Sequence, residues 1–254
     1  MNEVIRLAFP PIIEAVIDVE CDMPAQFNLL ALEQAARTKF AGDYPEVKKR
    51  HIEQHRFQPR GEEPAEHTTS RGIQALQFIR SDKTQLIQVR ATGYSFNRLA
   101  PYGSLDDYLP EIERTWKDFV EISAPLQVRV VRLRYINRFL LPLKEGKLSF
   151  EEFLTVGPQL PDQTNLNFSG FMNQYSAVET STKARANVVL TAQPFVGDKL
   201  PLIFDITVEQ DATGPVENWA NIKAKIDALR ALKNHIFHYT LTPQCKKLFQ
   251  SPQT

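Results

Sequence analysis

The chain has 254 residues, and its 30 lysines and arginines balance 30 aspartates and glutamates, so its formal net charge is zero. This balance excludes the general positive field by which many proteins collect nucleic acid, although it leaves room for a local basic patch. Hydrophobic residues make up 43% and charged residues 24% of the chain. These values are typical of a soluble globular protein that can bury a sizeable core.

The cysteines and the start of the chain indicate its cellular setting. Cys21 and Cys245 are too few for a disulfide or metal framework, and we expect both to be buried thiols. Residues 1–11 lack the basic and apolar regions of a signal peptide, and no apolar run reaches the ~18 residues of a membrane span. These features predict a soluble, reduced, cytoplasmic protein.

The first half of the chain combines strand and helix patterns. Residues 12–20 alternate apolar and polar residues and predict a strand, and the clearest apolar stripe of the chain predicts a helix over 104–123. A loop rich in Glu, Pro, Thr and Ser is predicted over 59–72. The other predicted elements of this half are a helix over 24–40, a polar strand over 47–58, and a hairpin of 73–80 with 85–98.

The second half starts with a strand over 128–141, whose sequence is VRVVRLRYINRFLL, and includes a long helix over 216–238. The elements predicted between and after them are a short helix over 149–155, a hairpin of 168–180 with 184–192, a strand over 202–208, and a short helix that ends at 249.

The order of these elements predicts an α+β fold in one domain, residues 1–254. The halves 11–124 and 127–249 have the same order, so we predict pseudo-duplicated β-α-β(3)-α units that form one curved antiparallel sheet of about eight strands. Two long helices should cover one face of this sheet. The TATA-box-binding protein and the helix-grip folds have this general character, which is an analogy of fold and implies no function.

Three arginines occupy one face of the strand 128–141. Arg132, Arg134 and Arg138 share that face, and residues 131, 133, 135 and 139 lie on the opposite, apolar face. Guanidinium groups suit phosphates, so this face is a candidate site for an anionic ligand. The alternative is internal pairing with carboxylates of neighbouring strands, and both interpretations stay open. The carboxylates in question are Glu14, Asp18 and Asp205.

A second candidate cluster lies in residues 94–98. Tyr94, Phe96 and Arg98 share strand parity, as in platforms that stack single-stranded nucleic acid. The alternative is that Phe96 packs under the following helix while Arg98 pairs locally. If Arg98 and Arg138 lay on adjacent strands, the two clusters would form one cationic groove.

Other catalytic or metal-binding patterns are weak. His51 and His55 are four residues apart on a predicted strand, too far apart for one metal ion. No P-loop, GxGxxG, HExxH, nucleophile elbow or cysteine cluster occurs. We therefore predict no metal site and no cofactor, and an enzyme is the less favoured hypothesis.

Several short sequence segments together resemble a known family. They are PPIIEAVIDVE at 10–20, FNRLAPY at 96–102, WKDF at 116–119 and RLRYINR at 132–138. The chain resembles, along its whole length, a sporadically distributed prokaryotic family of uncharacterised proteins that has no established activity. The resemblance implies a patchily inherited cytoplasmic protein, a distribution common among defence and toxin–antitoxin genes.

The sequence therefore predicts a binding protein that uses the arginine-lined sheet face to hold a protein partner or an anionic ligand. One alternative is an enzyme that acts on a phosphate-bearing substrate in the same groove, and another is an RNA- or DNA-binding protein. The oligomeric state is left open. The candidate ligand-binding residues are Tyr94, Arg98, Arg132, Arg134 and Arg138.

Overall fold

The computed structural model describes residues 7–60, 63–143, 148–159 and 170–250, with side chains described outside 53–71. The fold is α+β, as predicted, and one antiparallel sheet of nine strands runs through it in the order β2-β3-β4-β5-β1-β6-β9-β8-β7. The strands of the first half are β1 (Ile12–Asp22), β2 (Glu46–Arg60), β3 (Glu63–Ile79), β4 (Gln85–Arg90) and β5 (Gly93–Leu99). Those of the second half are β6 (Gln127–Pro142), β7 (Met172–Val178), β8 (Arg185–Ala192) and β9 (Lys199–Gly214).

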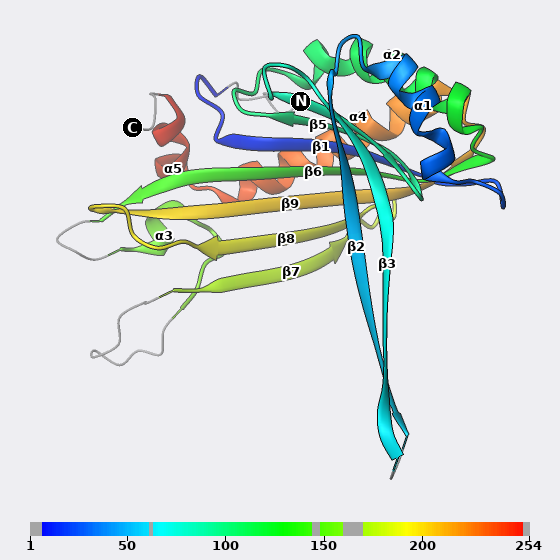
Figure 1. Ribbon diagram of the computed structural model, residues 1–254. Helices are drawn as coiled ribbons and strands as arrows, with labels where there is room; N and C mark the ends of the chain where they lie inside the picture. The colour runs from blue at the N-terminus through cyan, green and yellow to red at the C-terminus, as the bar shows by residue number, and fades with distance from the viewer. Residues whose placement is uncertain (1–6, 61–62, 144–147, 160–169, 251–254) are drawn as a thin grey trace.

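Three helices cover one face of the sheet. In Figure 1, α1 (Leu29–Phe40) and α2 (Leu105–Ser123) lie over the β3–β5 side, and α4 (Trp219–Thr240) runs along β6 and β9. Two short helices, α3 (Phe150–Phe153) and α5 (Pro243–Lys247), follow the ends of β6 and α4, and a single 3₁₀ turn follows α5 at Leu248–Gln250. The other face of the sheet has no helix among the described residues.

Strand alternation decides which side chains enter the core. Directly opposite residues of antiparallel strands lie on the same face, so each buried position has a buried neighbour on the next strand. One such row crosses the sheet under the helices and is buried throughout. Its members are Phe78, Ile87, Phe96, Ile17, Leu133, Val208 and Ala186.

The strongest sequence signals correspond to elements close to their predicted bounds. Ser104 caps α2 as the first residue of a capping box, and buried Trp116 and Phe119 belong to its apolar stripe. Asn28, rather than Pro24, begins α1, because its side chain accepts hydrogen bonds from the N–H groups of Leu30 and Ala31. Both cysteines are free and buried, as predicted.

The structure corrects the prediction in two places. The predicted loop over 59–72 is wrong for its described residues, 59–60 and 63–72, while 61–62 lie outside the described residues. β2 continues to Arg60, β3 starts at Glu63, and the two strands pair along almost their whole length. Backbone hydrogen bonds between strands need no apolar side chains, so the polar composition of this segment does not prevent pairing. The far part of this hairpin extends well beyond the rest of the sheet (Figure 1).

The second correction concerns residues 85–98, which form two strands and bring the total to nine instead of about eight. Gly93 follows the turn between β4 and β5 with a φ of +141°, a conformation that only glycine adopts without strain. A Cβ atom at this position would lie 2.2 Å from the carbonyl oxygen of Val19 on β1. Within the described residues, no helix is long and apolar enough to cross a membrane.

Candidate functional site

The arginine face of β6 lies on the side of the sheet away from the helices. Arg132 is directly opposite Asp18 on β1 and Glu209 on β9. Its guanidinium donates to Glu209 over 2.7 Å and to Glu20 over 3.0 Å, and its nearest contact to Asp18 is 3.9 Å. Arg132 therefore joins carboxylates of its two neighbouring strands, β1 and β9, as the internal-pairing interpretation predicts.

The carboxylates around Arg132 have further cationic partners. Asp18 also accepts from Arg90 on β4, and Arg185 on β8 donates to Glu209 over 2.9 Å. Only 9% of Asp18 is exposed, and this burial raises its pKa even though Arg90 and Arg132 act in the opposite direction. Ion pairs thus link side chains from β4 to β8 across the open face, which is the face of the sheet without helices among the described residues.

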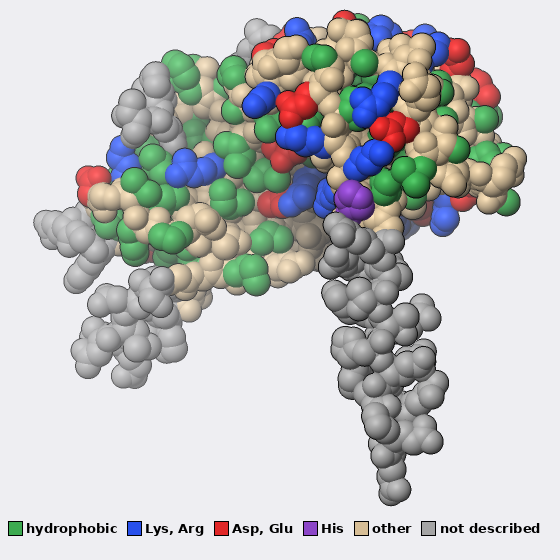
Figure 2. Space-filling model, viewed as in Figure 1, with side chains coloured by type: hydrophobic (Ala, Val, Ile, Leu, Met, Phe, Trp, Pro, Cys, Tyr) green, Lys and Arg blue, Asp and Glu red, His purple; other side chains and the backbone are tan. Residues whose placement is uncertain are grey.

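Arg134 and Arg138 are more exposed than Arg132. Arg134 donates to both oxygens of Asp205, with Nε 3.0 Å from each. Within the described residues, the Arg138 side chain has no hydrogen bond or ion pair. Glu14 accepts from Asn97 over 2.7 Å, so this carboxylate is engaged by an amide. In Figure 2 the basic and acidic side chains of the visible face are intermixed.

Tyr94 and Arg98 lie on the other, helix-covered face of the sheet. Tyr94 is completely buried, and its hydroxyl lies 2.7 Å from that of Thr115 on α2. Arg98 donates to the carbonyl oxygen of Pro101 over 3.0 Å, and its guanidinium carbon lies 5.0 Å from the ring centre of Tyr108. Because β1 separates β5 from β6, Arg98 and Arg138 do not form one groove.

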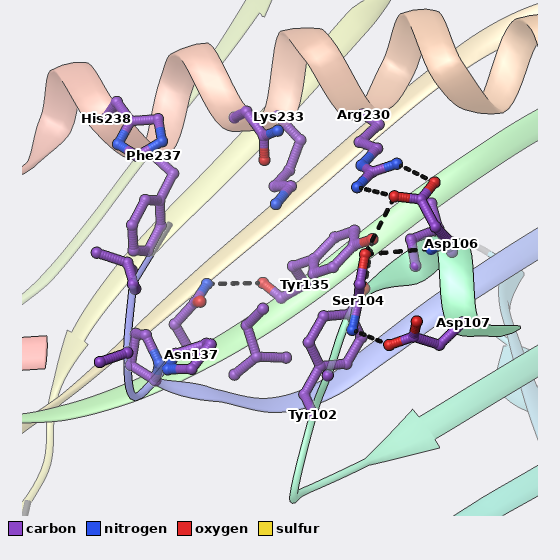
Figure 3. Close-up of a pocket in the computed structure, with 18 residues that line it drawn as sticks. Tyr102, Ser104, Asp106, Asp107, Tyr135, Asn137, Arg230, Lys233, Phe237 and His238 are labelled. Atoms are coloured by element: carbon purple, nitrogen blue, oxygen red, sulfur yellow. Dashed lines mark hydrogen bonds and ion pairs between the residues drawn. The ribbon is translucent and has the colours of Figure 1, made fainter. Parts of the chain in front are cut away.

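A pocket of about 740 Å³ lies on this helix-covered face, between α4, the start of α2 and β6. We call it the α4 pocket. The N-terminal segment forms one wall and is held by two backbone hydrogen bonds, from Phe9 to Phe249 and from Arg138 to Pro11. The side chains that define it are Tyr102, Tyr135, Asn137, Arg230, Lys233 and His238 (Figure 3).

Two sequence periods bring these side chains together. Tyr135 and Asn137 alternate with Arg134 and Arg138 on β6, so they face the helices and not the arginine face. On α4, the spacing of three to four residues aligns Arg230, Lys233 and Phe237 along the face that packs on the sheet. The pocket is therefore lined by the β6 residues on the opposite face of the strand from its arginines.

Lys233 is the unusual member of this group. Only 9% of the residue is exposed, and its Nζ lies 4.0 Å from the centre of the Tyr135 ring, a cation–π contact. In Figure 3 its side chain extends from α4 toward Tyr135. Among the described residues no hydrogen bond or ion pair reaches this amine. Burial, reinforced by the nearby charge of Arg230, lowers the pKa of Lys233 to about 7.

Other titratable side chains of this pocket are hydrogen-bonded to one another or partly buried. Arg230 donates to both oxygens of Asp106, over 2.7 and 2.9 Å, and these bonds lower the pKa of Asp106. The hydroxyls of Tyr102 and Tyr135 lie 3.3 Å apart. The Nδ1 atom of His238 is buried without a hydrogen-bond partner in the described part of the chain, and burial lowers the pKa of this residue.

The sequence contains a signal for this site in the buried face of α4. The buried positions of α4 include Ile226, Leu229, Lys233 and Phe237, at spacings of three and four. A lysine in such a stripe is unusual because lysine is rarely buried without a partner. Among the described residues, no group of three or more His, Cys, Asp or Glu is placed to hold a metal ion.

Comparison with known proteins adds no assignment: a scan against protein-family models and a search of curated proteins both return no match to this chain.

Proposed function

We propose that this chain is a binding protein for a small molecule with an acidic group, which it holds in the α4 pocket. The observation that carries the proposal is the Lys233 amine, which faces the pocket without a carboxylate partner in the described residues. A buried ammonium without a counter-charge is costly, and an anionic ligand would remove that cost.

The surroundings of Lys233 support a ligand of this kind. The guanidinium of Arg230 is already engaged by both oxygens of Asp106, so the positive group that is unpaired within the described residues and available to a ligand is the lysine. Tyr102, Tyr135 and Phe237 supply aromatic walls, while Asn234 and His238 supply polar groups. Apolar walls with a few convergent polar groups are typical of small-molecule sites.

The open sheet face supports a second proposal. Arg138 is exposed and its side chain has no partner among the described residues, so this face remains a candidate surface for a protein partner or an anionic ligand. Arg132 and Arg134 are engaged by carboxylates, which weakens their case as ligand-binding groups. A defence or toxin–antitoxin setting rests on the family resemblance alone, and zero net charge gives nucleic acid little support.

The first test is native mass spectrometry of protein purified gently at low salt, to detect a small molecule bound in the pocket. The second is a thermal-shift panel of acetate, succinate, citrate and inorganic phosphate at matched ionic strength. We expect at least one anion to raise the Tm of the wild type through preferential binding to the folded state.

Matched variants then assign the effect to the pocket. Lys233→Met removes the charge and keeps an apolar side chain, and we expect it to weaken binding by at least about tenfold, since a hydrogen bond to a charged group contributes ~1.5–3 kcal/mol. Lys225→Met is the control, because Lys225 lies on the same helix and does not line the pocket. Stabilisation that persists in Lys233→Met would contradict the proposal.

A further inference from the structure

The environment of the Lys233 nitrogen suits a nucleophile as well as a cation. The amine lies in a pocket, against an aromatic ring, and no carboxylate among the described residues holds it in the charged form. Lysines desolvated in apolar pockets or placed beside another cation are activated in this way for attack on carbonyl carbons. Both conditions hold here, because Arg230 lies one turn away on the same helix face.

We infer that Lys233 forms a covalent imine through Nζ with a small oxo acid, a molecule that carries an aldehyde or ketone group beside its acidic group. This inference rests on the proposed function, since it specifies the class of anion that the α4 pocket binds. The acidic group draws the ligand to the protonated amine, and the imine nitrogen, once protonated, carries the same charge in the same place.

The step balances without an oxidant or reductant. The lone pair of neutral Nζ attacks the carbonyl carbon, a C–N bond forms, and the carbonyl electron pair moves to oxygen, which gains a proton. The carbinolamine then loses water: the C–O bond breaks and the C=N bond forms. Both hydrogens of the released water balance the two hydrogens lost by the amine. The paired hydroxyls of Tyr102 and Tyr135 are the nearby groups that can relay a proton.

Several titratable groups line the pocket around Lys233. They are Arg230 and His238 on α4, Tyr135 on β6, Tyr102 before α2, and Asp106 and Asp107 in the first turn of α2. Burial raises the pKa of both tyrosines, so they stay neutral at physiological pH. Burial lowers the pKa of His238, and Asp106 is held in its charged form by Arg230. Among these titratable groups, Lys233 is therefore the one that loses its proton near pH 7.

The experiment compares two dicarboxylic acids of similar size, succinate and 2-oxoglutarate, of which only the second has a ketone carbon that can form an imine. Each is incubated with the full chain and sodium cyanoborohydride, which reduces an imine to a stable amine. Intact mass and peptide mapping then locate the adduct. We expect 2-oxoglutarate to label Lys233 at least about tenfold faster than Lys225 at pH 7, because an ordinary lysine is almost fully protonated there.

Two controls make the result specific. Lys225→Met should keep the adduct and Lys233→Arg should lose it, with circular dichroism to confirm that both variants fold. The labelling rate of the wild type should rise with an apparent pKa near 7, a profile that a merely structural lysine would not give.

The outcomes separate the two proposals. If both acids stabilise the protein through Lys233 and no adduct forms, the imine is overturned and the proposed function stands. Labelling spread evenly over surface lysines also overturns the imine. If neither acid stabilises the chain and no adduct forms, neither proposal survives for this class of ligand.

Discussion

At the scale of single residues, Lys233 ties the stability of the protein to pH. Its pKa is about 7 in the folded protein and about 10.5 in an unfolded chain, so between these values the unfolded state binds more protons. The free energy of unfolding must then rise with pH across this range, by up to about 1.4 kcal/mol per pH unit from this group. Below pH 7 Lys233 is protonated in both the folded and the unfolded state, so the full free-energy cost of burying its charge lowers the stability of the folded protein.

We therefore predict that Lys233→Met is more stable than the wild type at pH 7, and that the difference shrinks as pH rises to 9. Urea unfolding of both proteins at several pH values measures this difference in the free energy of unfolding. Lys225→Met is the control, and its difference from the wild type should not change with pH. Working above pH 7 avoids the titration of His238, whose pKa is lowered. A pH-independent difference would show that Lys233 is charged in the folded protein throughout.

The arginines of β6 differ in how much stability they contribute. Removing Arg132 leaves Glu20 without its arginine contact and weakens the network at buried Asp18, so we expect Arg132→Ala to cost about 2–3 kcal/mol. Arg134→Ala should cost less than about 1 kcal/mol, because 48% of that side chain is exposed. Chemical denaturation of both variants tests the order. A negligible cost for Arg132→Ala would indicate that this arginine is kept for a ligand.

Residue-level prediction from the sequence succeeded where a position follows from strand alternation. The alternation in β6 separates the arginines from Tyr135 and Asn137. Of the three carboxylates predicted as partners, Asp18 and Asp205 contact arginines of β6, whereas Glu14 accepts a hydrogen bond from Asn97. The same reasoning does not identify Lys233, because the helix over 216–238 is predicted from its apolar residues and a lysine is not one of them. Its position in the pocket depends on packing between distant segments, which no local pattern encodes.

At the scale of elements, the contact between β5 and β1 depends on one glycine. Gly93→Ala would need a strained backbone, and its Cβ would overlap the Val19 carbonyl of β1. We expect this change to cost about 3–5 kcal/mol or to prevent folding, because the overlap is with backbone and cannot be relieved by a side-chain rotation.

Gly42→Ala is the matched control for this prediction. Gly42 follows α1, and no atom lies within 4 Å of where its Cβ would be, so its replacement should change stability by less than about 1 kcal/mol. Soluble yield and thermal unfolding of the two variants make the comparison. Equal stability of both variants would contradict the close approach of β5 to β1.

The predictability of elements followed the strength of their apolar pattern. The alternation of β6 and the stripe of α2 have large apolar side chains at most core positions, and both elements lie within a few residues of their predicted bounds. The sequence of the β2–β3 hairpin has few such residues, so the sequence predicts a loop over 59–72, whereas residues 63–72 pair with β2. In that segment the backbone ladder with β2 defines the strand.

At the scale of the whole molecule, the central pair β1 and β6 joins the two halves of the chain. The ladder between them runs from Ile12 opposite Asn137 to Asp22 opposite Gln127, so the sheet continues from one half into the other. Trp116 of α2 also donates to the carbonyl oxygen of Val216 over 3.0 Å. These contacts predict that residues 1–254 unfold as one domain, while the pseudo-duplication and the likeness to the TATA-box-binding protein stay predictions.

The two tryptophans of the chain test this prediction, because Trp116 lies in the first half and Trp219 in the second. In Trp219→Phe the fluorescence reports the first half, and in Trp116→Phe it reports the second. Each variant has its own stability, since Trp116 is buried and hydrogen-bonded, so the comparison is made within a variant. In both, the urea midpoint from fluorescence should equal the midpoint from far-ultraviolet circular dichroism. A fluorescence midpoint that departs from the circular dichroism midpoint in either variant would mean that one half unfolds separately, and that the β1–β6 ladder does not couple them.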